Sequence, residues 1–262
     1  MIKKVLILCA MKEEEDAVLS KLQDHHIEAV NLSANNRLTL ILKHITFSNY
    51  ELFITQSGMG NVNAAVTLSL VLMNIDIDFV ILLGVAGALT PKLNIGDVVC
   101  SSTVLQHDYY SSLDDGNFRM KPGDLILNAE SATNHDPRQE SILKLGHCDN
   151  FLKFNADTYI GEIISGNEFV GTVERKKQLF ELSNNALAVD MEASAVAQVA
   201  NKFKIPFLII KTIADRLSPD GSIESDFQTF LNRATTNAAA FVDHIPQLLI
   251  FYSNQNAKQN TL

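Results

Sequence analysis

The segment from Ala188 to Asp215 limits the possible folds more than any other part of the chain. Its first residues, AVDME, indicate the end of an apolar strand that leads into a helix. Apolar residues of that helix recur at the amphipathic spacing i, i+3, i+4 and i+7, at Val196, Val199, Ala200 and Phe203. The run PFLIIKTI then predicts a second, buried strand. Two strands joined by a helix indicate an α/β fold with a largely parallel sheet.

The same alternation continues along the chain. Strands are expected at Val5–Ala10, Leu38–Ile45, Leu52–Gln56, Phe79–Leu83, Val98–Leu105, Tyr159–Ser165 and Ala188–Asp190. Helices are expected from Glu13 onward, from Asn61 (as the capping residue) to about Leu72, and from Ser225 to about Phe251. The polar stretch from His107 to Asp157 is predicted to be a loop excursion with short elements of its own.

No Pro/Gly/Ser-rich linker divides the chain into two self-contained halves. We therefore expect a single-domain, three-layer α/β sandwich with a central, mostly parallel mixed sheet over residues 1–252. The segment 253–262, SNQNAKQNTL, is polar and is predicted to be a disordered tail.

Composition narrows the class of function. The net charge of −9 argues against nucleic acid as a partner, because nucleic-acid binding needs a concentrated basic surface. The three cysteines (Cys9, Cys100 and Cys148) lack CxxC spacing and the seven histidines form no HExxH motif, so neither a metal nor a disulfide framework is expected. The apolar run VLILCA is short and is followed at once by charged residues, which predicts a cytoplasmic protein without a membrane partner.

Several unusual residues follow predicted strands: Glu14, the glycine-rich segments 58–60 and 84–87, Phe169, Asp190 to Glu192, and Asp215. Strand ends of a parallel sheet meet at one edge, where ligands bind in open α/β folds, so we expect these residues to form one site. Three carboxylates there favour a polyhydroxyl or basic ligand over an anion.

Taken singly, each of these residues also has a plainer explanation. The glycines suit a tight turn as well as a close approach of the backbone to a ligand. Glu14 and Glu192 suit the start of a helix, where negative charge is favourable. Asp215 suits a turn, and Phe169 suits the core. Their expected convergence at one edge of the sheet is the stronger argument for a site.

Seven segments occur in an order that resembles the nucleoside phosphorylase/nucleosidase superfamily, most closely its 5′-methylthioadenosine/S-adenosylhomocysteine nucleosidases. They are AMKEEE (10–15), SGMGNVNAA (57–65), GVAGAL (84–89), IGDVV (95–99), SGNEFV (165–170), AVDMEASAVA (188–197) and KTIAD (211–215). The resemblance covers roughly residues 2–250 and is weaker through 109–158. It implies the fold of that superfamily and release of adenine from a 5′-modified adenosine by hydrolysis, as in methionine salvage, with no cofactor.

The resemblance also implies a role for individual residues. Asp215 would protonate the purine N7, Glu192 would bind the ribose hydroxyls, and Glu14 would activate the attacking water with help from Lys211. The remaining substrate contacts would come from Met191 beneath the ribose, Phe169 and the backbone of Val170 at the base, Met11, Met59 and Phe227 around the ribose and its 5′-substituent, and Ala86 and Gly87 in the glycine-rich loop. A homodimer is implied, in which a loop of one subunit closes the 5′ pocket of the other.

Two alternatives remain open at this point. A nucleoside phosphorylase must hold phosphate, usually with several Arg and hydroxyl side chains, whereas this N-terminal loop offers Glu13, Glu14 and Glu15. A catalytically weak nucleoside-binding sensor is the other alternative. Val85 and Ala214 keep it open, because both stand where the nucleosidases usually carry Ser.

Overall fold

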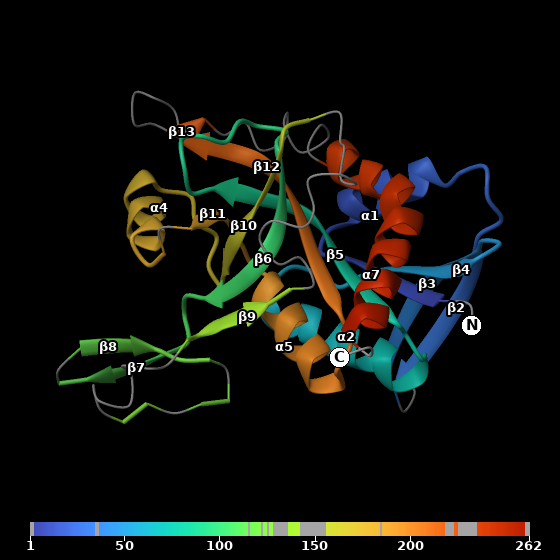
Figure 1. Ribbon diagram of the computed structural model, residues 1–262, viewed down its shortest axis with the longest axis horizontal. Helices are drawn as coiled ribbons and strands as arrows, with labels where there is room; N and C mark the ends of the chain where they lie inside the picture. The colour runs from blue at the N-terminus through green and yellow to red at the C-terminus, as the bar shows by residue number, and fades with distance from the viewer. Residues whose placement is uncertain are drawn as a thin grey trace.

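The computed structural model describes residues 3–34, 37–114, 116–121, 123–124, 126–127, 136–141, 156–183, 185–217, 223–224 and 235–259. A mixed sheet forms its middle layer, and helices cover both faces of the sheet (Figure 1). The expected three-layer α/β sandwich with a central mixed sheet is therefore confirmed.

Two groups of parallel strands make up the centre of the sheet. One group runs β4 (Tyr50–Gln56), β1 (Lys3–Cys9), β5 (Phe79–Ala88) and β12 (Phe207–Leu217). The other runs β6 (Val98–Gln106), β10 (Thr158–Ser165) and β11 (Ala186–Asp190). Antiparallel pairs join the groups, β12 to β6 and β5 to β11, so that five strands close on themselves. This closure brings the ends of β5, β11 and β12 close together.

Four further strands complete the described part of the sheet. β3 (Leu38–Thr46) and β2 (Glu28–Ala34) extend one edge in antiparallel fashion. β9 (Arg138–Glu140) pairs with β6, and β13 (Ile223–Glu224) pairs with β12. A separate hairpin of β7 (Tyr110–Leu113) and β8 (Gly116–Arg119) projects away from the body of the molecule (Figure 1).

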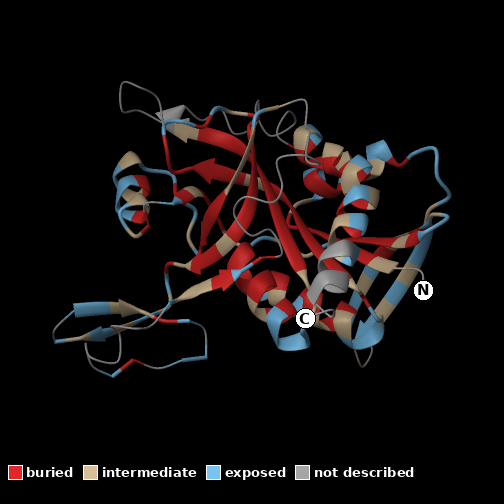
Figure 2. Ribbon diagram, viewed as in Figure 1, coloured by how far each residue is buried: buried red, intermediate tan, exposed pale blue. Residues whose placement is uncertain are grey.

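Helices seal both faces of the central strands. α1 (Lys12–Lys21), η1 (Ala240–His244) and α7 (Ile245–Gln259) lie on one face, and α2 (Asn61–Asn74) and α5 (Ala193–Phe203) lie on the other. Successive residues of β1 point to opposite faces, so Val5 and Ile7 join the first core and Leu6 and Leu8 join the second. The central strands are buried throughout (Figure 2), which explains why they are continuous apolar runs.

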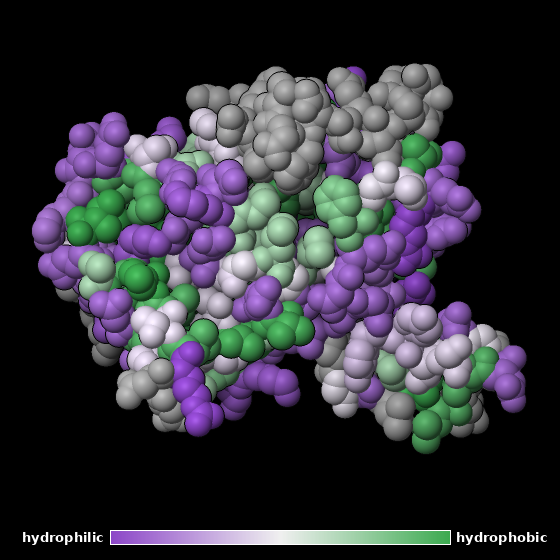
Figure 3. Space-filling model, turned by 180° about the vertical axis from the view of Figure 1, so that it is seen from behind, coloured by the Kyte–Doolittle hydropathy of each residue, from purple (hydrophilic) through white to green (hydrophobic). Residues whose placement is uncertain are grey.

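The outer surface of α2 is apolar. Val62, Val66 and Met73 all point to solvent, although helix residues at such positions are usually polar. When the molecule is seen from behind, hydrophobic residues gather near its middle and hydrophilic residues surround them (Figure 3).

The structure corrects several expected boundaries. β5 does not stop at Leu83, because it continues through the glycine-rich segment to Ala88. β12 continues past Asp215 to Leu217, so Asp215 lies within a strand and not after it. β2 and the helix α4 (Val173–Phe180) have no counterpart among the predicted elements. The short strands β7, β8 and β9 confirm that the polar excursion has elements of its own.

The ends of two helices also differ from expectation. Asn61 does not cap α2: Gly60, at φ 92°, precedes the helix. The Asn61 Oδ1 instead accepts hydrogen bonds from the Ser194 Oγ (2.8 Å) and the Ala195 N–H (3.2 Å), at the start of α5. α7 runs to Gln259, although disorder is expected from residue 253. The first part of the predicted closing helix, residues 225–234, lies outside the described residues.

Candidate functional site

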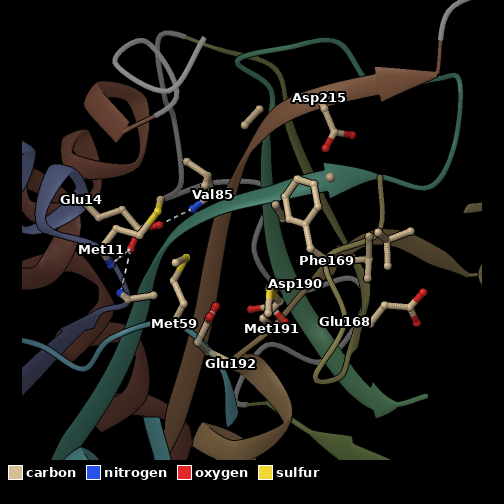
Figure 4. Close-up of a pocket in the computed structure, with 16 residues that line it drawn as sticks. Met11, Glu14, Met59, Val85, Glu168, Phe169, Asp190, Met191, Glu192 and Asp215 are labelled. Atoms are coloured by element: carbon tan, nitrogen blue, oxygen red, sulfur yellow. Dashed lines mark hydrogen bonds between the residues drawn. The ribbon is translucent and has the colours of Figure 1, made fainter. Parts of the chain in front are cut away.

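A cavity lies at the carboxyl ends of β1, β5 and β11, beside β12 (Figure 4). Ten of the twelve residues expected at the site line it: Met11, Glu14, Met59, Ala86, Gly87, Phe169, Val170, Met191, Glu192 and Asp215. The other lining residues are Ala10, Val85, Glu168, Val189, Asp190 and Ala214. Of the two remaining expected residues, Lys211 lies beneath the cavity and Phe227 lies outside the described residues. Residues spread over 200 positions of sequence thus meet at one edge of the sheet.

Glu14 is held by backbone groups on three sides. It is the third residue of α1, and its side chain turns back toward the start of that helix. Its Oε2 accepts hydrogen bonds from the N–H groups of Ala10 (2.7 Å) and Met11 (2.9 Å), and its Oε1 accepts one from Val85 (2.9 Å). Burial raises the pKa of Glu14 above that of an ordinary glutamate, although the charge of Lys211 and the N–H donors oppose the rise. Glu14 is therefore a fixed, buried carboxyl at the cavity wall.

Two glycines of β5 make room for site side chains. A Cβ at Gly84 would lie 2.3 Å from the Glu14 Oε1, and a Cβ at Gly87 would lie 3.0 Å from the Asp215 Oδ1. The sequence predicts that this segment lets the backbone approach a ligand. In the structure, the carboxyl groups of Glu14 and Asp215 occupy the space that side chains at these two positions would fill. This is a second reason for glycine there.

Glu192 is placed by the strand-to-helix junction between β11 and α5. Its Oε1 accepts a hydrogen bond from the Gly60 N–H (2.8 Å), and its Oε2 accepts one from the Lys211 Nζ (3.4 Å). Burial raises the pKa of Glu192, the Lys211 charge opposes this, and the neighbouring Asp190 adds to it. Asp190 accepts a hydrogen bond from the Ala193 N–H, so it has the structural role that the start of a helix favours.

Lys211 binds carboxylates beneath the cavity. Its Nζ lies 2.9 Å from the Asp190 Oδ2 and 3.4 Å from the Glu192 Oε2. Burial opposes its positive charge, but Asp190, Glu192 and Glu14 outweigh burial and raise the pKa of Lys211. Lys211 is therefore an ammonium group at neutral pH. It acts on Glu14 only through its charge, and it does not lie in the wall where a substrate contact is expected.

Asp215 owes its position to an irregularity in β12. The pairing of β12 with β5 shifts register between Ile213 and Asp215, which places Asp215 opposite Gly87. Such bulges re-aim side chains and are common beside active sites. The Asp215 Oδ1 forms an ion pair with the Lys176 Nζ, which also donates a hydrogen bond to the Ala88 carbonyl oxygen (2.9 Å).

Lys176 is the site residue that sequence patterns do not reveal. It lies on α4, within the charged run VERKKQLF, where a lysine usually indicates a solvated helix face. In the structure Lys176 and Leu179, three residues apart, are both buried, whereas Lys177 is exposed. The only sequence signal for the burial of Lys176 is its i, i+3 spacing from Leu179. The sequence does not distinguish Lys176 from the charged residues beside it.

Apolar side chains form the remaining walls. Met11, Met59, Val170 and Met191 line the cavity, and the ring of Phe169 points into it from the segment after β10 (Figure 4). Phe169 is 68% exposed, so it is not the core residue that its type suggests. An exposed aromatic ring beside a cavity is suited to stacking on a flat ligand.

Comparison with known proteins agrees with this geometry. Residues 4–246 match the family model of the phosphorylase superfamily. The chain belongs to this superfamily. A relative from Staphylococcus aureus (strain JH9), a 5′-methylthioadenosine/S-adenosylhomocysteine nucleosidase, is 31% identical over 237 residues, which are 90% of this chain and 96% of the relative.

Solved structures from the superfamily share the fold. A Helicobacter pylori 5′-methylthioadenosine/S-adenosylhomocysteine nucleosidase matches with a TM-score of 0.72 at 23% identity, covering 92% of this chain and 97% of that one. It is complexed with a compound in which an aminopyrrolopyrimidine is linked to a pyrrolidine with a propynylthio arm. The futalosine hydrolase of Helicobacter pylori matches with a TM-score of 0.70 at 23% identity, covering 94% and 98%.

The His, Cys, Asp and Glu side chains of the described residues form no group of three that could hold a metal ion. Among the helices described, none has both the length and the apolar character that crossing a bilayer requires.

We predict that Gly84→Ala lowers the free energy of unfolding by about 1–3 kcal/mol, because the new methyl group overlaps the Glu14 carboxyl. Urea denaturation measures the change. The matched control is the same substitution in a Glu14→Ala background, where the space is free and the cost should disappear. An equal loss in both backgrounds would show that Gly84 does not serve Glu14.

Proposed function

We propose that this protein hydrolyses the N-glycosidic bond of a 5′-modified adenosine, of the methylthioadenosine or adenosylhomocysteine type, and releases adenine. The observation that carries the proposal is the placement of Glu14 and Asp215 along one strand. Glu14 lies against Gly84 and Asp215 against Gly87, three residues further along β5. Three residues of extended strand span about 10 Å, which leaves room for a sugar between the two carboxyl groups.

The two carboxyl groups then have opposite tasks. Asp215 protonates N7 of the purine, so that the base leaves as a neutral molecule. Glu14 accepts a proton from the water that attacks the anomeric carbon on the other face of the sugar. Direct displacement by water at a sugar requires the two carboxyl groups to be far enough apart to admit the water molecule. Glu192 binds the ribose hydroxyls, and its negative charge favours the cationic, oxocarbenium-like sugar.

The apolar walls fit the rest of such a substrate. Phe169 stacks on the purine, and the Val170 backbone hydrogen-bonds to its edge. Met191 packs beneath the ribose, and Met11 and Met59 face the 5′-substituent. Methionine side chains are polarisable and adaptable, and a wall of this kind suits a thioether. The thioether arm of the ligand in the Helicobacter pylori nucleosidase supports the same assignment.

The charge of the cavity favours water over phosphate as the nucleophile. Five of the described lining residues are carboxylic acids (Glu14, Glu168, Asp190, Glu192 and Asp215), and none of the described lining residues is Lys or Arg. A phosphate anion would be repelled there, because its negative charge would meet no cation in the wall. This argues against the phosphorylase alternative.

The decisive experiment is incubation with 5′-methylthioadenosine, S-adenosylhomocysteine, inosine and 6-amino-6-deoxyfutalosine, with and without phosphate. We expect release of adenine from at least one 6-amino nucleoside at a rate that phosphate does not change, as followed by chromatography. The control variant Asp215→Asn should bind the nucleoside but release no base. Formation of ribose 1-phosphate products would refute hydrolysis, and the absence of base release with every nucleoside would favour a sensor.

The pKa shift of Glu14 predicts the acid side of the pH profile. Glu14 must be ionised to accept a proton from water, and burial raises its pKa above the ordinary value of 4.5. Activity should therefore fall as the pH is lowered, with a midpoint in kcat/KM above 4.5. Glu14→Gln should be nearly inactive at every pH. A midpoint at or below the ordinary glutamate value would remove Glu14 from this role.

We also propose that the enzyme is a cytoplasmic homodimer, in keeping with the family resemblance. Exposed apolar side chains on α2 support the dimer: Val62 and Met73 are each at least 70% exposed there, and exposed apolar patches commonly mark protein interfaces. Sedimentation at micromolar concentration should give twice the mass of one chain. A monomer under these conditions would contradict the proposal.

A further inference from the structure

Lys176 is the one described lysine that pairs with Asp215, and it is fully buried. α4 begins after Thr172, whose hydroxyl accepts a hydrogen bond from the Arg175 N–H. From that start, Lys176 points inward next to Leu179, and its side chain has no exposed surface. A lysine is almost never buried so completely unless its ammonium group is paired. Its position therefore depends on what the Nζ contacts.

The Nζ contacts two acceptors at the end of β5 and β12. It donates a hydrogen bond to the Ala88 carbonyl oxygen at 2.9 Å and forms an ion pair with the Asp215 Oδ1. Gly87 makes this approach possible, because a Cβ there would lie 2.9 Å from the Nζ. The contact occupies Oδ1, so Oδ2 is the carboxyl oxygen of Asp215 that remains for a ligand.

Other charges near this pair have partners elsewhere. Arg175, the preceding residue on α4, binds both carboxylate oxygens of Glu168. Arg216, the residue after Asp215, donates a hydrogen bond to Asn94. Lys211 serves Asp190 and Glu192. Within the part of the chain that the structure describes, the cation in contact with Asp215 is thus Lys176.

We propose that Lys176 is a positioning residue that acts through Asp215: it orients the carboxyl group toward the base and stabilises the carboxylate that forms when Asp215 gives up its proton. This inference rests on the proposed function of the same site. Lys176 itself touches neither substrate nor reacting atoms, since it lies behind Asp215.

The O–H bond at the Asp215 Oδ2 breaks and an N–H bond forms at N7 of the purine, while the electron pair of the glycosidic bond moves to the base. Asp215 is left as a carboxylate, and the Lys176 ammonium, which keeps its own protons, lies against it. A cation at that position lowers the free energy of the ionised acid and so favours the transfer.

The test compares kcat and KM of Lys176→Met with those of the wild-type enzyme, with Lys177→Met as the matched control on the exposed side of the same helix. Methionine has a similar length and no charge. We expect kcat to fall by about 10- to 100-fold with little change in KM, since loss of general acid catalysis costs this much or more. Lys177→Met should keep the wild-type kcat, because Lys177 is exposed on the same helix.

A second pair of variants covers the case in which Lys176→Met does not fold. Lys176→Arg keeps the cation and should retain most of the wild-type kcat, whereas Lys176→Gln removes the charge and should lower kcat as Lys176→Met does. A kcat that is the same in the Met, Gln and Arg variants, or a KM that rises as much as kcat falls, would overturn the proposal and leave Lys176 as a structural ion pair. Wild-type protein that releases no adenine would instead refute the proposed function, and this inference with it.

Discussion

The burial of carboxyl groups at one edge of the sheet is the constraint on which the rest of the site depends. A buried carboxylate is costly unless hydrogen bonds or a cation compensate for the lost water. The structure compensates each in a different way: Glu14 by three backbone N–H groups, Glu192 by the Gly60 N–H and Lys211, and Asp215 by Lys176. These contacts tie together β1, β5, α1, α4, α5 and β12, so the fold and the site stabilise one another.

β5 has a central place in this arrangement. It pairs with β1, β11 and β12, and it carries the two glycines that leave space for the side chains of Glu14 and Asp215. Because the strand stays regular through this segment, it sets the spacing between the two carboxyl groups. The bulge in β12 then turns Asp215 toward Gly87. Strand geometry, and not a flexible loop, therefore determines the distance between the proposed acid and the proposed base.

Much of this could be predicted from the chain. The apolar runs predict the central strands, and their alternation with helices predicts an α/β sandwich, because strands buried on both faces need helices on each side. The expected convergence of strand-end residues correctly brings Glu14, Glu192 and Asp215 to one cavity. One error concerns a partner, because Asn61 binds the start of α5 and does not cap α2. The structure also shows that Gly84 and Gly87 leave space for the carboxyl groups of Glu14 and Asp215.

The sequence by itself determined the central strands and most of the helices that cover them, the superfamily and ten of the residues that line the cavity, since all of these depend on local pattern and on motifs along the chain. Only the tertiary structure decided which charges meet. Lys176 and Asp215 are 39 residues apart, and a lysine in a charged helix has the same local pattern whether it is solvated or buried. The partner of Lys176 depends on how α4 packs beside β11 and on the register of β12 against β5. The residues next to Lys176 in the sequence determine neither of these.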